Sequence, residues 1–376
     1  MSSRFTWALV LTALAVRLPV LFSHQALLPA VAPWGPLVVW AQPWLDAAPD
    51  GWGWIGLGLL GALADAASAV LIARLVERRR LADRLLTPKR EPEGWASPGF
   101  WAGLAWAAHP VAVMLAGSAG AWQSVALFCL LVAAWNLEYS AHPAAEGRAS
   151  LAMGLAISVA LWPLLLLPLG AAGLLSRRAR LSFYRQALFL PLILALPWLL
   201  IKDPQSVLAA LKGSRSLLAF PGLLRALWAA AGAPLAQLQP LLHGWHLVAL
   251  FGLLLYFATS FWRPAALLPG MALGAWVWAL LAPQLQGPLL LAPLGLALLV
   301  PGRLPLRLSV ATFVLLLLQD QLPGLRGLQL QQADPGSQGV QLLWAALSLV
   351  WLFWVALELL RLSSFARRSG RFDRGR

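Results

Sequence analysis

The chain has 376 residues, of which 60% are hydrophobic and only 11% are charged, and its mean hydropathy is +0.74. Soluble domains carry about 45–50% apolar and 25% charged residues, so this composition excludes a soluble domain and indicates an integral membrane protein. The formal net charge is +14, but the arginines gather in short runs between apolar segments, as they do in cytoplasmic loops of membrane proteins. We therefore expect membrane lipids, and no nucleic acid, as partners.

The first two apolar segments predict two membrane-spanning helices. Residues 5–22 and 54–76 are each long enough to cross about 30 Å of hydrocarbon. The loop between them, 23–53, is rich in proline and tryptophan, and the densest basic cluster of the chain follows at 78–90. Because basic loops stay in the cytoplasm, we expect residues 77–97 and both termini inside and loop 23–53 outside.

Residues 99–138 predict a helical hairpin. Two apolar runs flank the small and polar residues GSAGAWQS at 117–124. The glycines of this stretch can take the positive φ of a tight turn, and Trp122 is a residue type that settles at membrane–water boundaries. We expect the tip to lie at the outer boundary and to offer Gln123 and Ser124 to the loop above it.

The next apolar stretch, 149–175, predicts a broken helix. A single span would leave the basic run 177–180 outside the cell. A break at Trp162-Pro163 removes this conflict, because proline deletes a backbone donor and kinks or ends a helix. Broken helices are tolerated in membranes where protein or a wet cavity satisfies the freed backbone groups.

The remaining chain predicts a C-terminal group of membrane helices within a single integral membrane domain, 1–376. A core at 1–201 ends with the span 183–201, and a second outer loop, 202–241, separates it from C-terminal helices at 242–361 and a basic cytoplasmic tail at 362–376. The C-terminal apolar segments are 246–261, 265–281, 289–300, 304–318 and 340–360. We expect an all-α bundle of about ten to twelve membrane helices, some short or broken.

Two ionisable residues lie inside the predicted spans, where they are costly and mark candidate sites. Arg17 lies toward the outer end of the first span and Asp65 near the middle of the second. Their depths differ by about 8 Å at the helical rise, which a guanidinium stem can close. We expect an ion pair that locks the two helices; in the alternative, Arg17 also binds a lipid phosphate at the outer leaflet.

The sequence predicts no clustered metal site. The five histidines are scattered, and the single cysteine, Cys129, lies inside an apolar run. Metal sites need grouped His, Cys, Asp or Glu side chains. His243 and His246, three residues apart, are the alternative place for a cation.

Four stretches taken in order carry a family resemblance: TALAVRLPVLF, ALADAASAVLIARLVERRR, AAHPVAVMLAGSAGAWQSVALFCLLVAAW and GLAISVALWPLLLLPLGAAGLLSRR. They resemble the GT-C superfamily of polyprenyl-phosphate-dependent glycosyltransferases, and most of all its bacterial mannosyltransferase-like branch, related to GPI mannosyltransferase I. The family's first span ends in an arginine-leucine pair, here Arg17-Leu18, and its second carries an aspartate before small residues, here Asp65. The resemblance covers about the first 200 residues.

The resemblance implies a GT-C-like bundle that transfers a hexose such as mannose from a polyprenyl-phosphate sugar on the outer face. A divalent cation is the one cofactor that it would admit. The implied substrate-binding residues are Arg17, Asp65, His24, Gln123, Ser124 and Trp122.

Catalysis would fall to the acids of the first outer loop. The family has an acid soon after the first span, where this chain has Ser23-His24-Gln25, and a hairpin aspartate, where this chain has Gln123. A sugar transfer needs a general base for the acceptor hydroxyl, and Asp46 and Asp50 are the acids that loop 23–53 retains. His24 is an alternative base.

Two other functions stay open. A non-catalytic GT-C relative would serve as a lipid-binding subunit or as the partner of another membrane protein. A transporter or flippase normally shows chains of intramembrane charges or paired repeats, and this chain offers one arginine, one aspartate and no evident repeat.

Overall fold

The computed structural model describes residues 3–23, 36–49, 52–84, 97–114, 118–139, 144–174, 176–201, 219–232, 235–262, 266–282, 287–300, 304–321 and 338–373. Within these ranges the secondary structure consists of helices and contains no β-strand, which confirms the predicted all-α class. Five segments are long and apolar enough to cross a membrane: Trp52–Arg79, Ala121–Glu138, Arg177–Leu196, Pro240–Trp262 and Gly339–Ser364. The chain is therefore a multi-pass membrane protein. Its total of ten to twelve segments stays a prediction.

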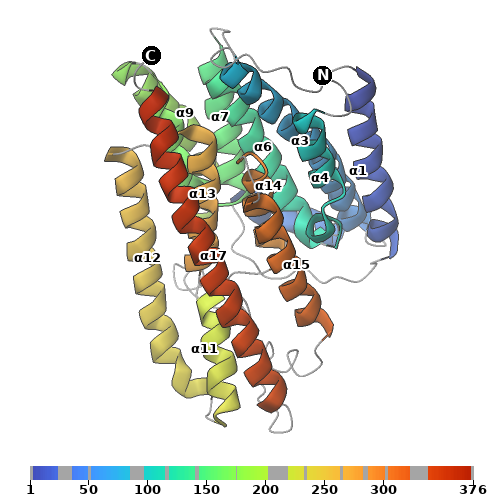
Figure 1. The fold of residues 1–376 in the computed structure, drawn as a ribbon, viewed down its shortest axis with the longest axis vertical. Helices are drawn as coiled ribbons and strands as arrows, with labels where there is room; N and C mark the ends of the chain where they lie inside the picture. Colours follow the sequence, from blue (N-terminus) through green and yellow to red (C-terminus); the bar gives the residue numbers. More distant parts are fainter. Residues whose placement is uncertain are drawn as a thin grey trace.

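The N-terminal half is organised around α3 (Trp52–Arg84). This helix packs against α1 (Ser3–Ser23), α4 (Pro98–Ala107) and α6 (Ser118–Tyr139), as Figure 1 shows. Without a hydrophobic driving force between helices in lipid, close packing depends on small side chains. A Cβ added to Gly61 of α3 would lie only 2.6 Å from the Cα of Ala121 in α6.

A second close crossing joins α3 and α4. A Cβ on Gly103 would lie 2.7 Å from the carbonyl oxygen of Ala69, and a Cβ on Gly99 would lie 2.5 Å from that of Ala73. Both pairs are spaced four residues apart, so each helix presents one small-residue ridge to the other. This crossing fixes the first half of α4 against α3.

The predicted tip of the hairpin was wrong. Residues 118–124 form the first turns of α6, and Trp122, Gln123 and Ser124 are all buried in the bundle. The first arm of the hairpin is also interrupted, because α4 ends at Ala107 and a short helix, α5 (Pro110–Met114), follows.

Loop 23–53, predicted as an outer loop, contains a helix, α2 (Pro36–Ala47). This helix packs on α3, α7 (Ala145–Val159) and α9 (Arg177–Ile201). The indole N–H of Trp40 donates to the carbonyl oxygen of Leu194 in α9 at 2.8 Å. α2 therefore ties α3 to α7 and α9.

The break at Trp162-Pro163 is confirmed. α7 ends at Val159, and Ala160 has an extended backbone with φ −145° and ψ 131°. A 3-10 helix, η3 (Trp162–Leu166), and a short helix, α8 (Leu167–Ala172), come before α9. The chain thus passes from α7 to α9 through two short pieces rather than one long span.

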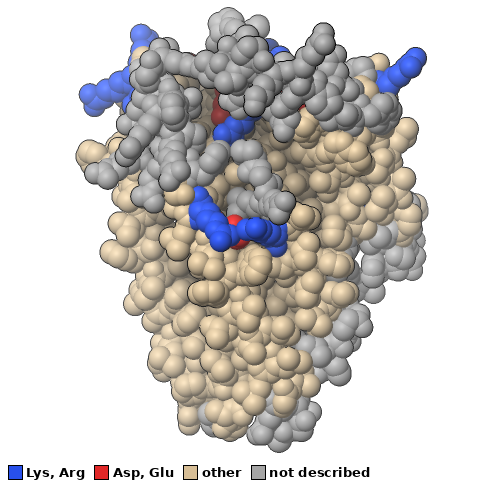
Figure 2. All heavy atoms as spheres, viewed as in Figure 1, with Lys and Arg blue, Asp and Glu red and all other residues tan. Residues whose placement is uncertain are grey.

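The C-terminal half extends the bundle away from α1, with α11, α12, α15 and α17 reaching the opposite end of the molecule (Figure 1). Its elements are α11 (Ala219–Ala230), η4 (Leu235–Leu238), α12 (Gln239–Trp262), α13 (Leu267–Leu281), η5 (Gly287–Leu290), α14 (Leu291–Ala297), α15 (Leu304–Gln321) and α17 (Gln338–Asp373). Large apolar side chains of α9 and α12 are exposed along most of their length, and Figure 2 shows a face whose lower half carries no described charge. Such surfaces belong in lipid.

Candidate functional site

Polar side chains from both halves of the chain meet inside the bundle. We call this group the central polar cluster; its members are Arg17, Asp65, Trp106, His109, Gln123, Ser124, Trp162 and Ser309. All of them are buried. Buried polar groups need partners. The hydrogen bonds of this cluster therefore show which donors and acceptors are already used.

Arg17 of α1 and Asp65 of α3 form the predicted ion pair. Arg17 Nε donates to Asp65 Oδ2 at 2.9 Å, and the two side chains are 0% and 2% exposed. The pair links α1 to α3 inside the bundle, where each charge needs a partner within the protein. The structural role expected from the sequence is thereby confirmed.

The guanidinium of Arg17 also binds the end of α4. One terminal nitrogen, Nη1, donates to the carbonyl oxygens of Ala13 and Ala107, and Nη2 donates to that of Trp106 at 3.2 Å. The last carbonyls of a helix have no partner within the helix. The Trp106 carbonyl oxygen accepts a 3.1 Å bond from the backbone N–H of His109, and Pro110 has no N–H to make the helical bond to it, so Arg17 adds a second donor there.

These bonds leave Arg17 little capacity for a ligand. An arginine has five N–H donors, and the bonds to Asp65, Ala13, Ala107 and Trp106 use four of them. In this conformation the side chain is also fully buried. The alternative that Arg17 binds a lipid phosphate finds no support in this geometry.

Several polar atoms around the pair have no hydrogen-bond partner in the part of the chain that the structure describes. The side chains of Ser124 and Trp106 lie beside the Asp65 carboxylate, yet Asp65 Oδ1 and Trp106 Nε1 are unpartnered, as is Ser68 Oγ one turn along α3. Buried atoms of this kind commonly bond ordered water.

His109 occupies the break between α4 and α5. Its Nε2 lies 2.8 Å from Ser309 Oγ of α15, while its Nδ1 has no described partner. The Trp106 and His109 rings are 5.6 Å apart between centroids. The break in the hairpin thus connects the ion pair to the C-terminal half.

Gln123 contacts the broken helix. The indole N–H of Trp162 points at Gln123 Oε1 over 3.4 Å, a long hydrogen bond, and Gln123 Nε2 has no described partner. Trp162 in turn stacks on Trp278 of α13 with centroids 5.4 Å apart. A buried amide with a spare N–H is a group that positions a polar ligand, but it cannot act as a general base.

Asp46, one of the two candidate acids, is not brought to the central polar cluster. Asp46 is exposed on α2, and the preceding residue, Leu45, has its backbone against Gly53 in the first turn of α3. Gly53 and Asp65 are twelve positions apart in α3, about 18 Å at the helical rise. Asp46 therefore lies far from Asp65. Asp50 and His24 lie outside the described residues.

Within the described ranges, no group of three or more His, Cys, Asp or Glu side chains is placed to hold a metal ion. The divalent cation admitted by the resemblance therefore stays an expectation. The side chains of His243 and His246 lie outside what the structure describes.

Trp106 and Ser309 were missed from the sequence. Pro110 marked the helix end beside Trp106 by the same rule that identified Trp162-Pro163, so that signal was present. Ser309 had none, because a serine two hundred positions from His109 looks like any other helix serine.

No known family matches the chain in sequence, and no curated protein matches it either.

Proposed function

We propose that the protein binds a polyprenyl-phosphate-linked sugar at the outer face of the membrane and transfers a hexose such as mannose, in the manner of the GT-C enzymes that it resembles. In this proposal Asp50 is the base, and both termini lie in the cytoplasm. One observation supports this proposal: the motifs that carry the resemblance converge in space. Arg17 of α1 and Asp65 of α3 bond each other, and Arg17 also bonds the end of α4 beside His109-Pro110. Ser124 of α6 lies beside the Asp65 carboxylate, and its neighbour in the chain, Gln123, contacts Trp162. Motifs that assemble in this way are typical of a single site.

A second candidate is a non-catalytic GT-C-like subunit that binds lipid or a partner membrane protein. The specific observation behind it is that the bonds of Arg17 and Asp65 are used to join α1, α3 and α4. Asp46 is also remote from that pair. A site of this kind holds helices together without offering a free cation or base.

The two candidates are separated by an assay of sugar transfer from radiolabelled polyprenyl-phosphate sugars to membrane acceptors with the purified protein. If the transferase proposal is right, Asp50→Asn loses at least about 100-fold in turnover, the usual contribution of a general base, while Asp46→Asn and the control Asp83→Asn keep most of it. Asp83 lies on the opposite, predicted cytoplasmic side. Absence of turnover with every donor, in protein that still binds the donor, favours the non-catalytic subunit. Turnover that survives Asp50→Asn refutes the assigned base.

A further inference from the structure

A cavity opens between α8, the start of α9 and the end of α12, away from the central polar cluster. Its volume is about 770 Å³. Pro168, Ala171 and Ala172 of α8 form its floor, and Arg177, Arg180 and Tyr184 line it from α9. Phe261 and Trp262 close it from α12. This size is within the range of small-molecule sites.

The cavity is strongly cationic. Its described lining holds two guanidinium groups and no carboxylate. Arg180 Nε donates to the carbonyl oxygen of Leu174 at 2.9 Å, which holds that side chain at the wall. The amino end of α9 lies here too, with no acidic residue in its first turn, and helix amino ends favour anions. These features select an anionic group.

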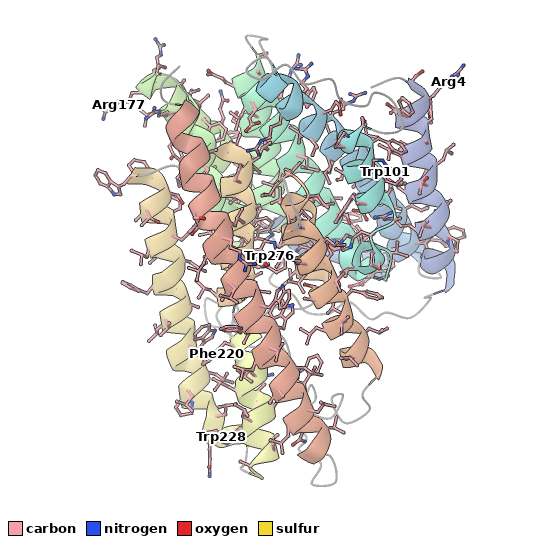
Figure 3. All side chains as sticks on the ribbon, in the orientation of Figure 1. Arg4, Trp101, Arg177, Phe220, Trp228 and Trp276 are labelled. Atoms are coloured by element: carbon pink, nitrogen blue, oxygen red, sulfur yellow. The ribbon has the colours of Figure 1, made fainter. Side chains whose placement is uncertain are left out.

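The walls of the cavity continue into apolar surfaces. On α9, Leu181 is 60% exposed and is followed by exposed Phe189 and Leu192; on α12, Trp262 is 78% exposed. Tryptophan at the end of a lipid-facing helix marks the headgroup level of a bilayer. Figure 3 shows Arg177 at the end of the molecule where Arg4 also lies. The acyl chains of a lipid whose anionic headgroup is held here would thus lie along the apolar faces of α9 and α12.

We propose that this cavity binds the phosphate headgroup of an anionic phospholipid, with Arg177 and Arg180 on the phosphate and Trp262 against the glycerol region. Basic pockets between membrane helices are suited to such headgroups. The site does not depend on the proposed transferase function. It also does not depend on which face of the membrane carries this end of the bundle.

The face of α9 that each arginine occupies provides a matched control. Arg177, Arg180, Leu181 and Tyr184 line the cavity at helical spacing. The neighbouring Arg178 is exposed, as Arg177 is, but does not line it. Arg177→Gln and Arg178→Gln therefore remove the same charge from the same turn. Only the first substitution removes it from the cavity.

The experiment is native mass spectrometry of the full chain in detergent, titrated with phosphatidylglycerol, phosphatidylcholine or inorganic phosphate. We expect phosphatidylglycerol to bind at least about fivefold more tightly than phosphatidylcholine, and Arg177→Gln to weaken it about fivefold, the factor for one basic residue against an anionic lipid. Arg178→Gln should change it less than twofold. Trp262→Ala should weaken the lipid without changing its charge preference.

Three results would overturn the proposal. Equal losses in Arg177→Gln and Arg178→Gln would show a general charge effect. Equal binding of phosphatidylglycerol and phosphatidylcholine would show that the negative charge of the headgroup does not contribute to binding. Displacement of the lipid by inorganic phosphate at comparable concentration would show that the cavity takes free phosphate. Because each variant is first checked for an unchanged melting temperature, failure to fold is distinguished from failure to bind.

Discussion

At the scale of single residues, Arg17 combines two tasks that are usually separate. It neutralises Asp65, and it donates to the last two carbonyls of α4, those of Trp106 and Ala107. Only a planar guanidinium with several divergent N–H groups can bond a carboxylate and two helix carbonyls together, and a lysine ammonium offers a compact point charge instead. The charge is therefore tolerated inside the bundle because four of the five N–H groups of the guanidinium are bonded.

The first prediction concerns this pair. Asp65→Asn leaves the Arg17 charge without its counter-charge, and we expect a loss of about 3–5 kcal/mol of stability. The double change Arg17→Leu with Asp65→Leu should recover part of the loss, since both charges are gone. Recovery should be incomplete, because the carbonyls of Trp106 and Ala107 lose the donors that Arg17 supplies, although Trp106 keeps the backbone N–H of His109. Thermal melting in detergent, followed by tryptophan fluorescence, measures all three variants.

The control for this cycle is Asp46→Asn, which changes an exposed acid of α2 and should alter stability by no more than about 0.5 kcal/mol. Strictly additive losses in the single and double variants would mean that Arg17 and Asp65 do not interact energetically.

The pair could be predicted from the sequence, while its surroundings could not. Arg17 and Asp65 are conspicuous because charges are costly in membrane spans, and helical rise alone brings them to similar depth. The contact of His109 with Ser309 joins residues two hundred positions apart, and no local pattern encodes it. Trp122 is of a residue type common at membrane interfaces, but it is buried, because tryptophan is suited both to an interface and to a protein core.

At the scale of elements, several helices end inside the bundle, and arginine side chains donate to the carbonyl oxygens at or just after those ends. α4 stops before Pro110 and Arg17 caps it. Arg180 bonds the carbonyl oxygen of Leu174 just after α8, and Arg79 reaches that of Leu299 after α14 at 3.5 Å. Cations at helix carboxyl ends also oppose the helix dipole. Proline reveals such breaks in the sequence, as at Trp162-Pro163, but it does not reveal which distant arginine supplies the donors.

The second prediction tests the packing of α3 on α6. Gly61→Ala places a Cβ 2.6 Å from the Cα of Ala121, so backbone must move, and we expect a loss of about 1–3 kcal/mol. Gly56→Ala, in the same helix, meets nothing within 4 Å and should instead stabilise by about 0.5–1 kcal/mol through helix propensity. The melting temperatures of the two variants should move in opposite directions. A shift in the same direction for both would contradict the close crossing at Gly61.

At the scale of the whole molecule, the bundle has two distinct ends. The chain starts and finishes at the same end, where α1 begins and α17 stops (Figure 1), and Arg4 and Arg177 lie there too (Figure 3). α2 follows the far end of α1, since it lies between α1 and α3 in the chain. Together with the basic loops in the sequence, this arrangement favours one orientation, with the arginine-rich end in the cytoplasm.

The third prediction tests that orientation with an impermeant thiol reagent on intact cells. Ala47→Cys, exposed at the end of α2, should react, and Ser364→Cys, exposed near the end of α17, should react only after the membrane is permeabilised. Both are made with Cys129→Ala, because Cys129 is the only native cysteine. The reason is the asymmetry of the arginines: 362–376 carries five of them, whereas loop 23–53 carries none, and basic segments remain inside. If Ser364→Cys labels first and Ala47→Cys is protected, α2 faces the cytoplasm. The loop acids would then be on the wrong side for a donor at the outer face, and the proposed transfer would have to be abandoned.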